Sequence, residues 1–205
     1  ASVPDILGWQ GIAIETSMDI YKAFMDAAAE HYGEDWKPEE LTLNTAGSPT
    51  YQLHKETIHA NEVAVGSALV KPTHFDVSTL ADHVPASFIT TPVVKTADRT
   101  DIPGLEALTG PTRLWDRNTA QTFFIYGGNW LAEPVSPPGL RTNGVFGRSS
   151  NQEMLNGSDR IELAVNDTVV LRPTQSEFVF LQFGDIAVFD GGKITESWPV
   201  FTQGA

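Results

Sequence analysis

The chain has 205 residues, 41% of them hydrophobic and 10% aromatic, enough to bury a sizeable core in one domain or two small ones. Its 26 acidic and 13 basic residues give a formal net charge of −13, which repels nucleic acid and anionic membrane surfaces. The lack of cysteine excludes disulfides, thiol nucleophiles and thiolate metal sites, and no apolar run is long enough for a membrane-spanning helix. A cytoplasmic location fits this composition.

The first 55 residues indicate a helix, a strand and a turn. An apolar face with i, i+4 spacing follows the Thr16-x-x-Asp19 pattern of a helix N-terminus, and Gly33 is a typical helix end. We therefore predict a helix over residues 17–32, followed by a strand at 41–44. A piece of this size is too small to cover both faces of a parallel sheet, so we expect it to belong to a larger α/β unit.

Beyond residue 55 the sequence changes to short β-branched or aromatic runs separated by Gly, Pro and Asn. Seven such runs predict short strands and therefore an all-β barrel or sandwich domain. The predicted strands cover residues 63–70, 87–95, 122–126, 160–164, 168–171, 178–183 and 186–189. The proline-rich stretch 133–143 is expected to form an irregular loop, because proline has no N–H to donate to a strand ladder. The predicted domains are thus residues 1–55 and 56–205.

Several polar segments are candidates for binding. Residues 47–51 (GSPTY) follow a predicted strand and combine flexible backbone N–H groups with hydroxyls, which suits a phosphate dianion; a plain connecting turn is the alternative. The segments 126–128, 149–152 and 173–177 can line a pocket or form ordinary turns. The histidines show no metal-binding spacing, and we expect all five to be structural or surface residues: His31, His54, His59, His74 and His83.

Six short motifs occur in a fixed order: GSALVKP at 66–72, TPVVK at 91–95, YGG at 126–128, GRSSNQ at 147–152, RPTQSE at 172–177 and FGD at 183–185. As an ordered set they resemble the D-serine dehydratase-like family, which includes the D-threonine aldolases. The resemblance implies the C-terminal half of a fold-type III, alanine-racemase-like pyridoxal-phosphate enzyme. Residues 1–55 then correspond to an α/β remnant, the last units of a cofactor-binding (β/α)8 barrel, and residues 56–205 to the C-terminal β-domain.

The resemblance also implies which residues bind the cofactor. The family's loop for the phosphate of pyridoxal 5'-phosphate falls on Gly47, Ser48, Thr50 and Tyr51. The family's Schiff-base lysine lies on the first barrel strand. We therefore expect it to lie outside this chain, so that the chain alone cannot anchor the cofactor.

The substrate side of the site is implied in the same way. The family's Pro-x-His-x-Cys metal pair falls on Gln175 and Glu177, whose oxygen donors suit Mg²⁺, Mn²⁺ or Ca²⁺ better than Zn²⁺. Glu177 is expected to bind a hard metal ion, to act as an acid toward the departing β-hydroxyl, or to hydrogen-bond within the pocket. Tyr126, Asn151 and Gln152 are expected to line that pocket.

The leading hypothesis is therefore the C-terminal portion of a pyridoxal-phosphate-dependent lyase, a dehydratase, deaminase or aldolase. Its substrate would be a small D-β-hydroxy amino acid such as D-serine or D-threonine. The expected partners are an N-terminal barrel portion or a second chain in a homo-oligomer. The alternative is a non-catalytic β-module for small-ligand binding or subunit pairing. Racemisation and decarboxylation also stay open, because they differ only in the fate of the carbanion at Cα.

Overall fold

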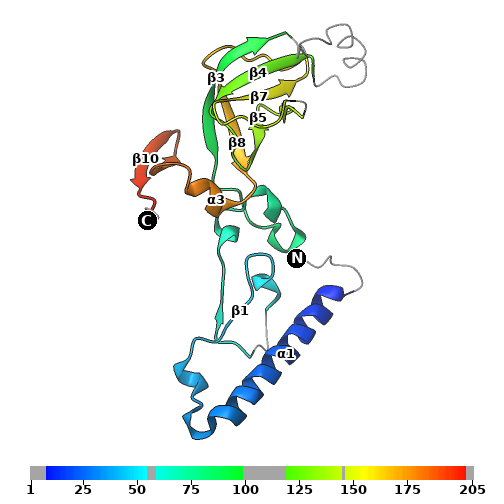
Figure 1. Cartoon of the computed structure of the whole chain (residues 1–205), viewed down its shortest axis with the longest axis vertical. Coiled ribbons are helices and arrows are strands. Elements are labelled where there is room, and N and C mark those ends of the chain that lie inside the picture. The colour runs from blue at the N-terminus through cyan, green and yellow to red at the C-terminus, as the bar shows by residue number, and fades with distance from the viewer. Residues whose placement is uncertain (1–7, 55–58, 99–118, 145, 202–205) are drawn as a thin grey trace. The chain divides into compact units, whose positions relative to one another are not determined.

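The computed structural model describes residues 8–54, 59–98, 119–144 and 146–201, and these form mostly β-structure with one long helix (Figure 1). The chain divides into two compact units, Ala1–Ala86 and Ser87–Ala205. Residues 59–86 belong to the first unit because they pair and hydrogen-bond with residues 43–52. The predicted boundary at residue 55 concerns the domains of a longer protein, and it stays a prediction. Within the described ranges, no helix is long and apolar enough to cross a membrane.

The first unit opens with the helix α1 (Trp9–Tyr32). Its end is as predicted: Gly33 adopts a left-handed φ of 55°, and its N–H bonds to the carbonyl of Ala29. The predicted start at residue 17 is wrong. The helix begins after Gly8, whose φ of 76° interrupts the helical backbone, so Thr16 lies inside the helix and caps nothing.

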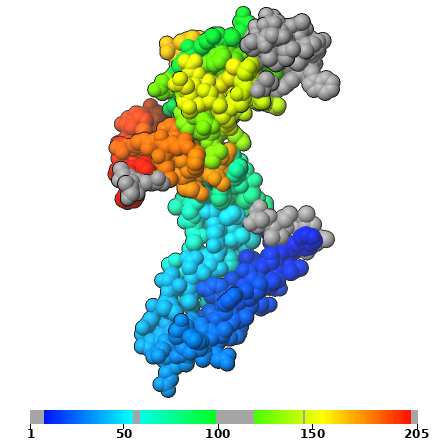
Figure 2. Space-filling view, viewed as in Figure 1, coloured from blue at the N-terminus to red at the C-terminus, as the bar shows by residue number. Residues whose placement is uncertain are grey.

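Most of the apolar surface of α1 is uncovered in its own unit. Only Met18 of the helix is buried, whereas Trp9, Ile12, Ile20 and Phe24 are exposed, Phe24 to 75%. Figure 2 shows one side of the helix open along its length. An amphipathic helix normally buries its apolar stripe, so these side chains are suited to packing against another structural layer.

The remainder of the first unit is short elements joined by turns. The strand β1 (Asn44–Thr45) pairs in parallel with β2 (Glu62–Val63). The predicted strand at 63–70 is wrong beyond Val63, because Ser67 closes a tight turn by accepting the N–H groups of Val70 and Lys71. The 3₁₀ helices are η1 (Gly33–Asp35), η2 (Pro38–Glu40), η3 (Tyr51–Leu53), η4 (Ser67–Leu69), η5 (Thr73–Phe75) and η6 (Ser78–Leu80).

The second unit is built on a six-stranded antiparallel sheet with the order β5-β8-β3-β4-β7-β6. The edge strands β5 and β6 approach one another, so the sheet curls toward a barrel (Figure 1). Its strands are β3 (Ile89–Ala97), β4 (Gln121–Tyr126), β5 (Ala132–Ser136), β6 (Arg141–Thr142), β7 (Gln152–Gly157) and β8 (Thr168–Pro173). The short helix α3 (Ser176–Phe180) follows β8, and the hairpin β9 (Ile186–Asp190) and β10 (Lys193–Trp198) ends the described chain.

The core of the second unit follows from the period of two in the strands. Alternate residues point to one face of a strand, so Phe123 and Ile125 on β4 are buried together, as are Val169 and Leu171 on β8. Leu155 on β7 completes this layer and is also fully buried. The core cluster is Ile89, Val93, Phe123, Ile125, Ala132, Leu140, Leu155, Val169, Leu171 and Val179.

Four predicted strands are confirmed as β3, β4, β8 and β9. The strand at 178–183 is wrong: a short apolar run fits a helix turn as well as a strand, and here Val179 is the buried residue of α3. The strand at 160–164 is wrong because the Asp167 carboxylate accepts the Ala164 N–H in a turn. The expected loop at 133–143 contains β5 and β6, and the edge position of β5 tolerates Pro134 beside a register shift.

Candidate functional site

The predicted phosphate loop is a tight turn after β1. Gly47 accepts hydrogen bonds at its carbonyl from the Thr50 N–H at 2.9 Å and the Tyr51 N–H at 3.0 Å, and the Thr50 hydroxyl also donates to it at 3.3 Å. A Cβ atom built at Gly47 would meet nothing within 4 Å, so the backbone borders open space. Within the described part of the chain, the N–H groups of Gly47 and Ser48 make no hydrogen bond. The loop therefore has two backbone donors without a partner among the described residues: that of Gly47 borders open space, and that of Ser48 belongs to a buried residue.

Hydrogen bonds with residues 66–79 anchor this loop. The buried hydroxyl of Ser48 accepts the N–H groups of Gly66 at 3.1 Å and Ala68 at 3.0 Å. The Thr79 hydroxyl donates to the carbonyl of Pro49 at 2.6 Å. The hydroxyl of Ser48, predicted to bind phosphate, therefore anchors the loop through its lone pairs and retains its own O–H as a donor.

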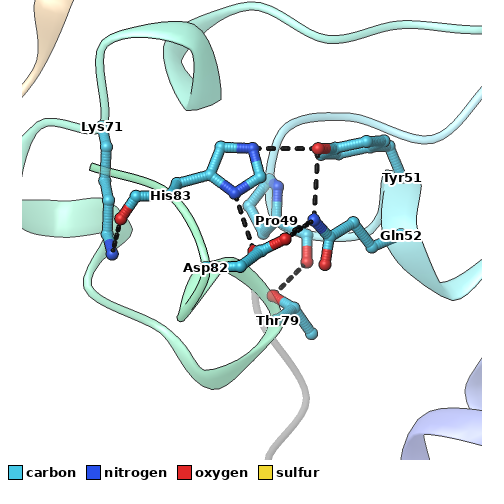
Figure 3. Close-up of polar contacts among 7 residues, drawn as sticks. All are labelled: Pro49, Tyr51, Gln52, Lys71, Thr79, Asp82 and His83. Carbon is cyan, nitrogen blue, oxygen red and sulfur yellow. Dashed lines mark hydrogen bonds and ion pairs between the residues drawn. The ribbon is translucent and has the colours of Figure 1, made fainter. Parts of the chain in front are cut away.

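A chain of side-chain hydrogen bonds starts at Tyr51 (Figure 3). The Tyr51 hydroxyl lies 2.9 Å from Nε2 of His83, whose Nδ1 lies 2.9 Å from the Asp82 carboxylate. The Gln52 amide donates to both Asp82 oxygens, at 3.1 and 3.0 Å, and to the Tyr51 hydroxyl at 3.3 Å. The hydrogen bonds of His83 and then of Gln52 hold the pKa of Asp82 below its ordinary value of 3.8.

A buried lysine supports the same histidine. Lys71 is 8% exposed, and its Nζ donates to the backbone carbonyl of His83 at 2.7 Å (Figure 3). From the sequence, His83 was predicted to be a structural or surface residue, and no role was predicted for Lys71. The only local signal was the adjacent Asp82 and His83, because the bond to Tyr51 spans 32 positions.

A cavity of about 310 Å³ lies in the first unit beside the loop. Its walls come from the first turns of α1, from residues 45–54 and from η6. The lining residues are Gln10, Ala13, Ile14, Ser17, Thr45, Ala46, Pro49, Thr50, Leu53, His54 and Thr79. The Nδ1 atom of His54, a lining residue, is buried and has no hydrogen-bond partner in the described structure.

The predicted pocket residues of the second unit lie in two places. Tyr126 at the end of β4 is in register with Gln152 at the start of β7, and Asn151 accepts the N–H of Gly127. Ile125 pairs with Val93 of β3, whose neighbour Pro92 pairs with the first residue of β8, whereas Gln175 and Glu177 follow the last residue of β8. All five side chains are exposed, Tyr126 to 68%. The structure thus brings Tyr126, Asn151 and Gln152 together and places Gln175 and Glu177 beyond the end of β8.

The predicted metal pair occupies the start of α3. Gln175 is the residue before the helix and Glu177 lies in its first turn, on either side of the buried Ser176. The Ser176 hydroxyl donates to the Glu177 carboxylate at 2.9 Å. Among the described residues, no group of three or more His, Asp or Glu side chains is placed to hold a metal ion. The metal site stays a prediction.

A buried carboxylate that sequence reasoning missed lies under Tyr126 and Gln152. Glu153 is 1% exposed; its Oε1 lies 2.9 Å from Nη1 of Arg148, and its Oε2 accepts the Asn129 N–H at 2.6 Å. Arg148 also donates to the carbonyls of Trp130 and Ala132. These bonds tie the turn after β4 to the start of β7.

No protein-family model matches the chain, and no curated protein matches it either. Among solved structures, it is similar to the D-threonine aldolase from Filomicrobium marinum, with a TM-score of 0.64 and 16% sequence identity. The match covers 89% of this chain and 45% of the aldolase chain. The fold of this chain is therefore similar to that of a protein from the family that the sequence motifs resemble, and the chain spans about half the length of that structure.

Proposed function

We propose that this chain is the C-terminal portion of a pyridoxal-phosphate-dependent lyase that acts on D-β-hydroxy amino acids such as D-serine or D-threonine. The observation that carries the proposal is the fold likeness to D-threonine aldolase over 89% of the chain. It is supported by the six ordered motifs and by a turn, at the position of the family's phosphate loop, whose Gly47 and Ser48 N–H groups have no partner among the described residues.

The uncovered helix supports a larger assembly. Four side chains on α1 are at least half exposed, and no described element of their unit covers them: Trp9, Ile12, Ile20 and Phe24. In the last units of a (β/α)8 barrel, such side chains would pack against the neighbouring helices of an N-terminal portion. We propose that portion, in a homo-oligomeric enzyme, as the partner.

The loop fits the phosphate end of the cofactor. Open space at Gly47 allows close approach of phosphate oxygens, and the N–H groups of Gly47 and Ser48 have no partner among the described residues. The hydroxyls of Ser48 and Thr50 belong to the same turn. When bound, pyridoxal phosphate would supply an electron sink for a carbanion at the substrate Cα. The Schiff-base lysine would come from the N-terminal portion.

The exposed residues that the resemblance assigns to the substrate pocket have side chains suited to binding the amino acid. Glu177 would exchange a proton with the substrate β-hydroxyl, and Gln175 would orient that hydroxyl. Cleavage of the Cα–Cβ bond requires the hydroxyl to lose its proton to a base, whereas elimination of water requires it to gain one from an acid. Tyr126, Asn151 and Gln152 would contact the polar groups of the amino acid. A hard divalent ion at Gln175 and Glu177 would polarise the hydroxyl oxygen instead.

The test is to join the 205 residues to the protein encoded upstream, load the product with pyridoxal phosphate and offer D-threonine and D-serine, with the L-enantiomers as controls. Glycine and acetaldehyde would identify an aldolase, and pyruvate and ammonia a dehydratase. We expect Glu177→Gln to reduce turnover by about 10²- to 10⁴-fold, the usual contribution of a general acid or base. The exposed Glu162→Gln is the matched control. No cofactor binding and no product would refute the proposal and favour a non-catalytic β-module.

A further inference from the structure

For a neutral imidazole, the hydrogen bonds around His83 have one consistent set of donors. The Asp82 carboxylate accepts from Gln52 and is held ionised, so it accepts from His83 as well, and Nδ1 of the ring carries the proton. In a neutral imidazole the other nitrogen is then an acceptor. The Tyr51 hydroxyl therefore donates to Nε2 of His83 across 2.9 Å.

The Tyr51 hydroxyl is fixed from two sides. It donates to His83 and accepts from the Gln52 amide at 3.3 Å, and the same amide contacts Asp82. The ring also packs edge-on against the His83 imidazole, with centroids 5.9 Å apart. Among the described residues, the charged groups in contact with this cluster are Asp82 and Lys71, and Lys71 donates to the His83 carbonyl. The ring of Tyr51 is consequently held in one position (Figure 3).

The position of Tyr51, together with the Thr50 N–H, orients the Gly47 carbonyl in the loop. Its backbone N–H bonds to the Gly47 carbonyl at 3.0 Å, so the residue that holds the ring also closes the turn. That carbonyl and the Ser48 N–H belong to the same planar peptide group, and fixing one orients the other. The direction of the Ser48 donor thus depends on a contact made by a side chain 32 positions from Tyr51.

We propose that His83, backed by Asp82, is a positioning residue that holds Tyr51 and with it the anion-binding conformation of the loop 47–51. This inference rests on the proposed function only for the identity of the anion, the phosphate of pyridoxal phosphate. The anchors at Ser48 and Thr79 do not involve His83, so a His83 variant keeps the loop attached while its turn becomes looser.

The experiment uses the 205-residue chain and ¹⁵N NMR. We expect Nδ1 of His83 to carry a proton in its contact with Asp82, and we expect Tyr51→Phe to move the Nε2 resonance of His83 and of no other histidine. His83→Ala should broaden or shift the Gly47 and Ser48 amide signals. His83→Gln retains a polar side chain able to accept the Tyr51 hydroxyl and should restore much of the wild-type spectrum. His74→Ala, at an exposed histidine of the same unit, is the control and should leave the loop unchanged.

Titration with inorganic phosphate completes the test. We expect phosphate to shift the Gly47 and Ser48 amides, and we expect His83→Ala to weaken this binding about tenfold, the effect of losing one good hydrogen bond. A wild-type chain whose loop amides do not respond to phosphate overturns the phosphate site of the proposed function. An Nε2 resonance unaffected by Tyr51→Phe, or a loop unaffected by His83→Ala, overturns the positioning role whatever ligand the loop binds.

Discussion

Replacing Glu153 with alanine should destabilise the second unit by about 3 kcal/mol. The change leaves the Asn129 N–H without its acceptor under the surface, which costs about 1–3 kcal/mol, and it removes buried side-chain packing worth about 0.8 kcal/mol per methylene. The lost ion pair adds less, because the Arg148 side chain is 35% exposed and regains water. Glu153→Gln keeps the volume and an acceptor for Asn129, so it should cost less than half as much.

Native-state hydrogen exchange of the β4 and β7 amides measures this effect in the unit concerned, because these two strands pair directly around Glu153. Glu162→Ala removes an exposed carboxylate of the same unit and should change stability by less than about 0.5 kcal/mol. A cost below about 1 kcal/mol for Glu153→Ala, or equal costs for the alanine and glutamine variants, would show that the buried carboxylate does not hold the turn after β4.

Three further predictions concern other parts of the chain. Gly128→Ala should lower the free energy of unfolding, measured with urea, by about 2–5 kcal/mol, because φ is +136° and the new Cβ would collide with Glu153 and Ser149. The control Gly144→Ala places its Cβ in open space and should leave that free energy nearly unchanged. Folding lowers the pKa of Asp82, so the ionised carboxylate stabilises the folded state. This stabilisation is fully present at pH values above the ordinary pKa of 3.8, and it is lost as the pH falls through the lower pKa of the folded state. The difference in unfolding free energy between wild type and Asp82→Asn should therefore shrink in acid, and a constant difference would contradict the pairing with His83. Phe24→Ser should leave the stability of the isolated chain within about 0.5 kcal/mol and weaken its association with the N-terminal portion, measured by sedimentation.

Local patterns in the sequence predicted three of the six strands of the sheet, β3, β4 and β8, and missed β5, β6 and β7. The alternation at Phe123 and Ile125 fits one buried face of β4, and the same reasoning applies to Val169 and Leu171 on β8. Prediction failed where a short apolar run has two solutions, as at α3, and where an edge position tolerates a proline, as at Pro134 in β5.

The candidate site could be predicted only in part. The motifs identified Tyr126 and Gln152, which the structure places side by side, and Gln175, which lies apart from them beyond the end of β8. The partners of Tyr51 could not be found in this way. Its contact with His83 depends on the path of the chain between them, and a histidine with no metal-binding spacing carries no signal of such a role.

The most direct test of the proposed function is to locate the cofactor in the complete protein. The chain joined to its upstream portion is loaded with pyridoxal phosphate, reduced with borohydride, digested and analysed by mass spectrometry. We predict one phosphopyridoxyl-lysine adduct, on a lysine outside the 205 residues. An adduct on Lys22, Lys37, Lys55, Lys71, Lys95 or Lys193, or no adduct on any lysine, would contradict the proposal that this chain is the C-terminal portion of such an enzyme.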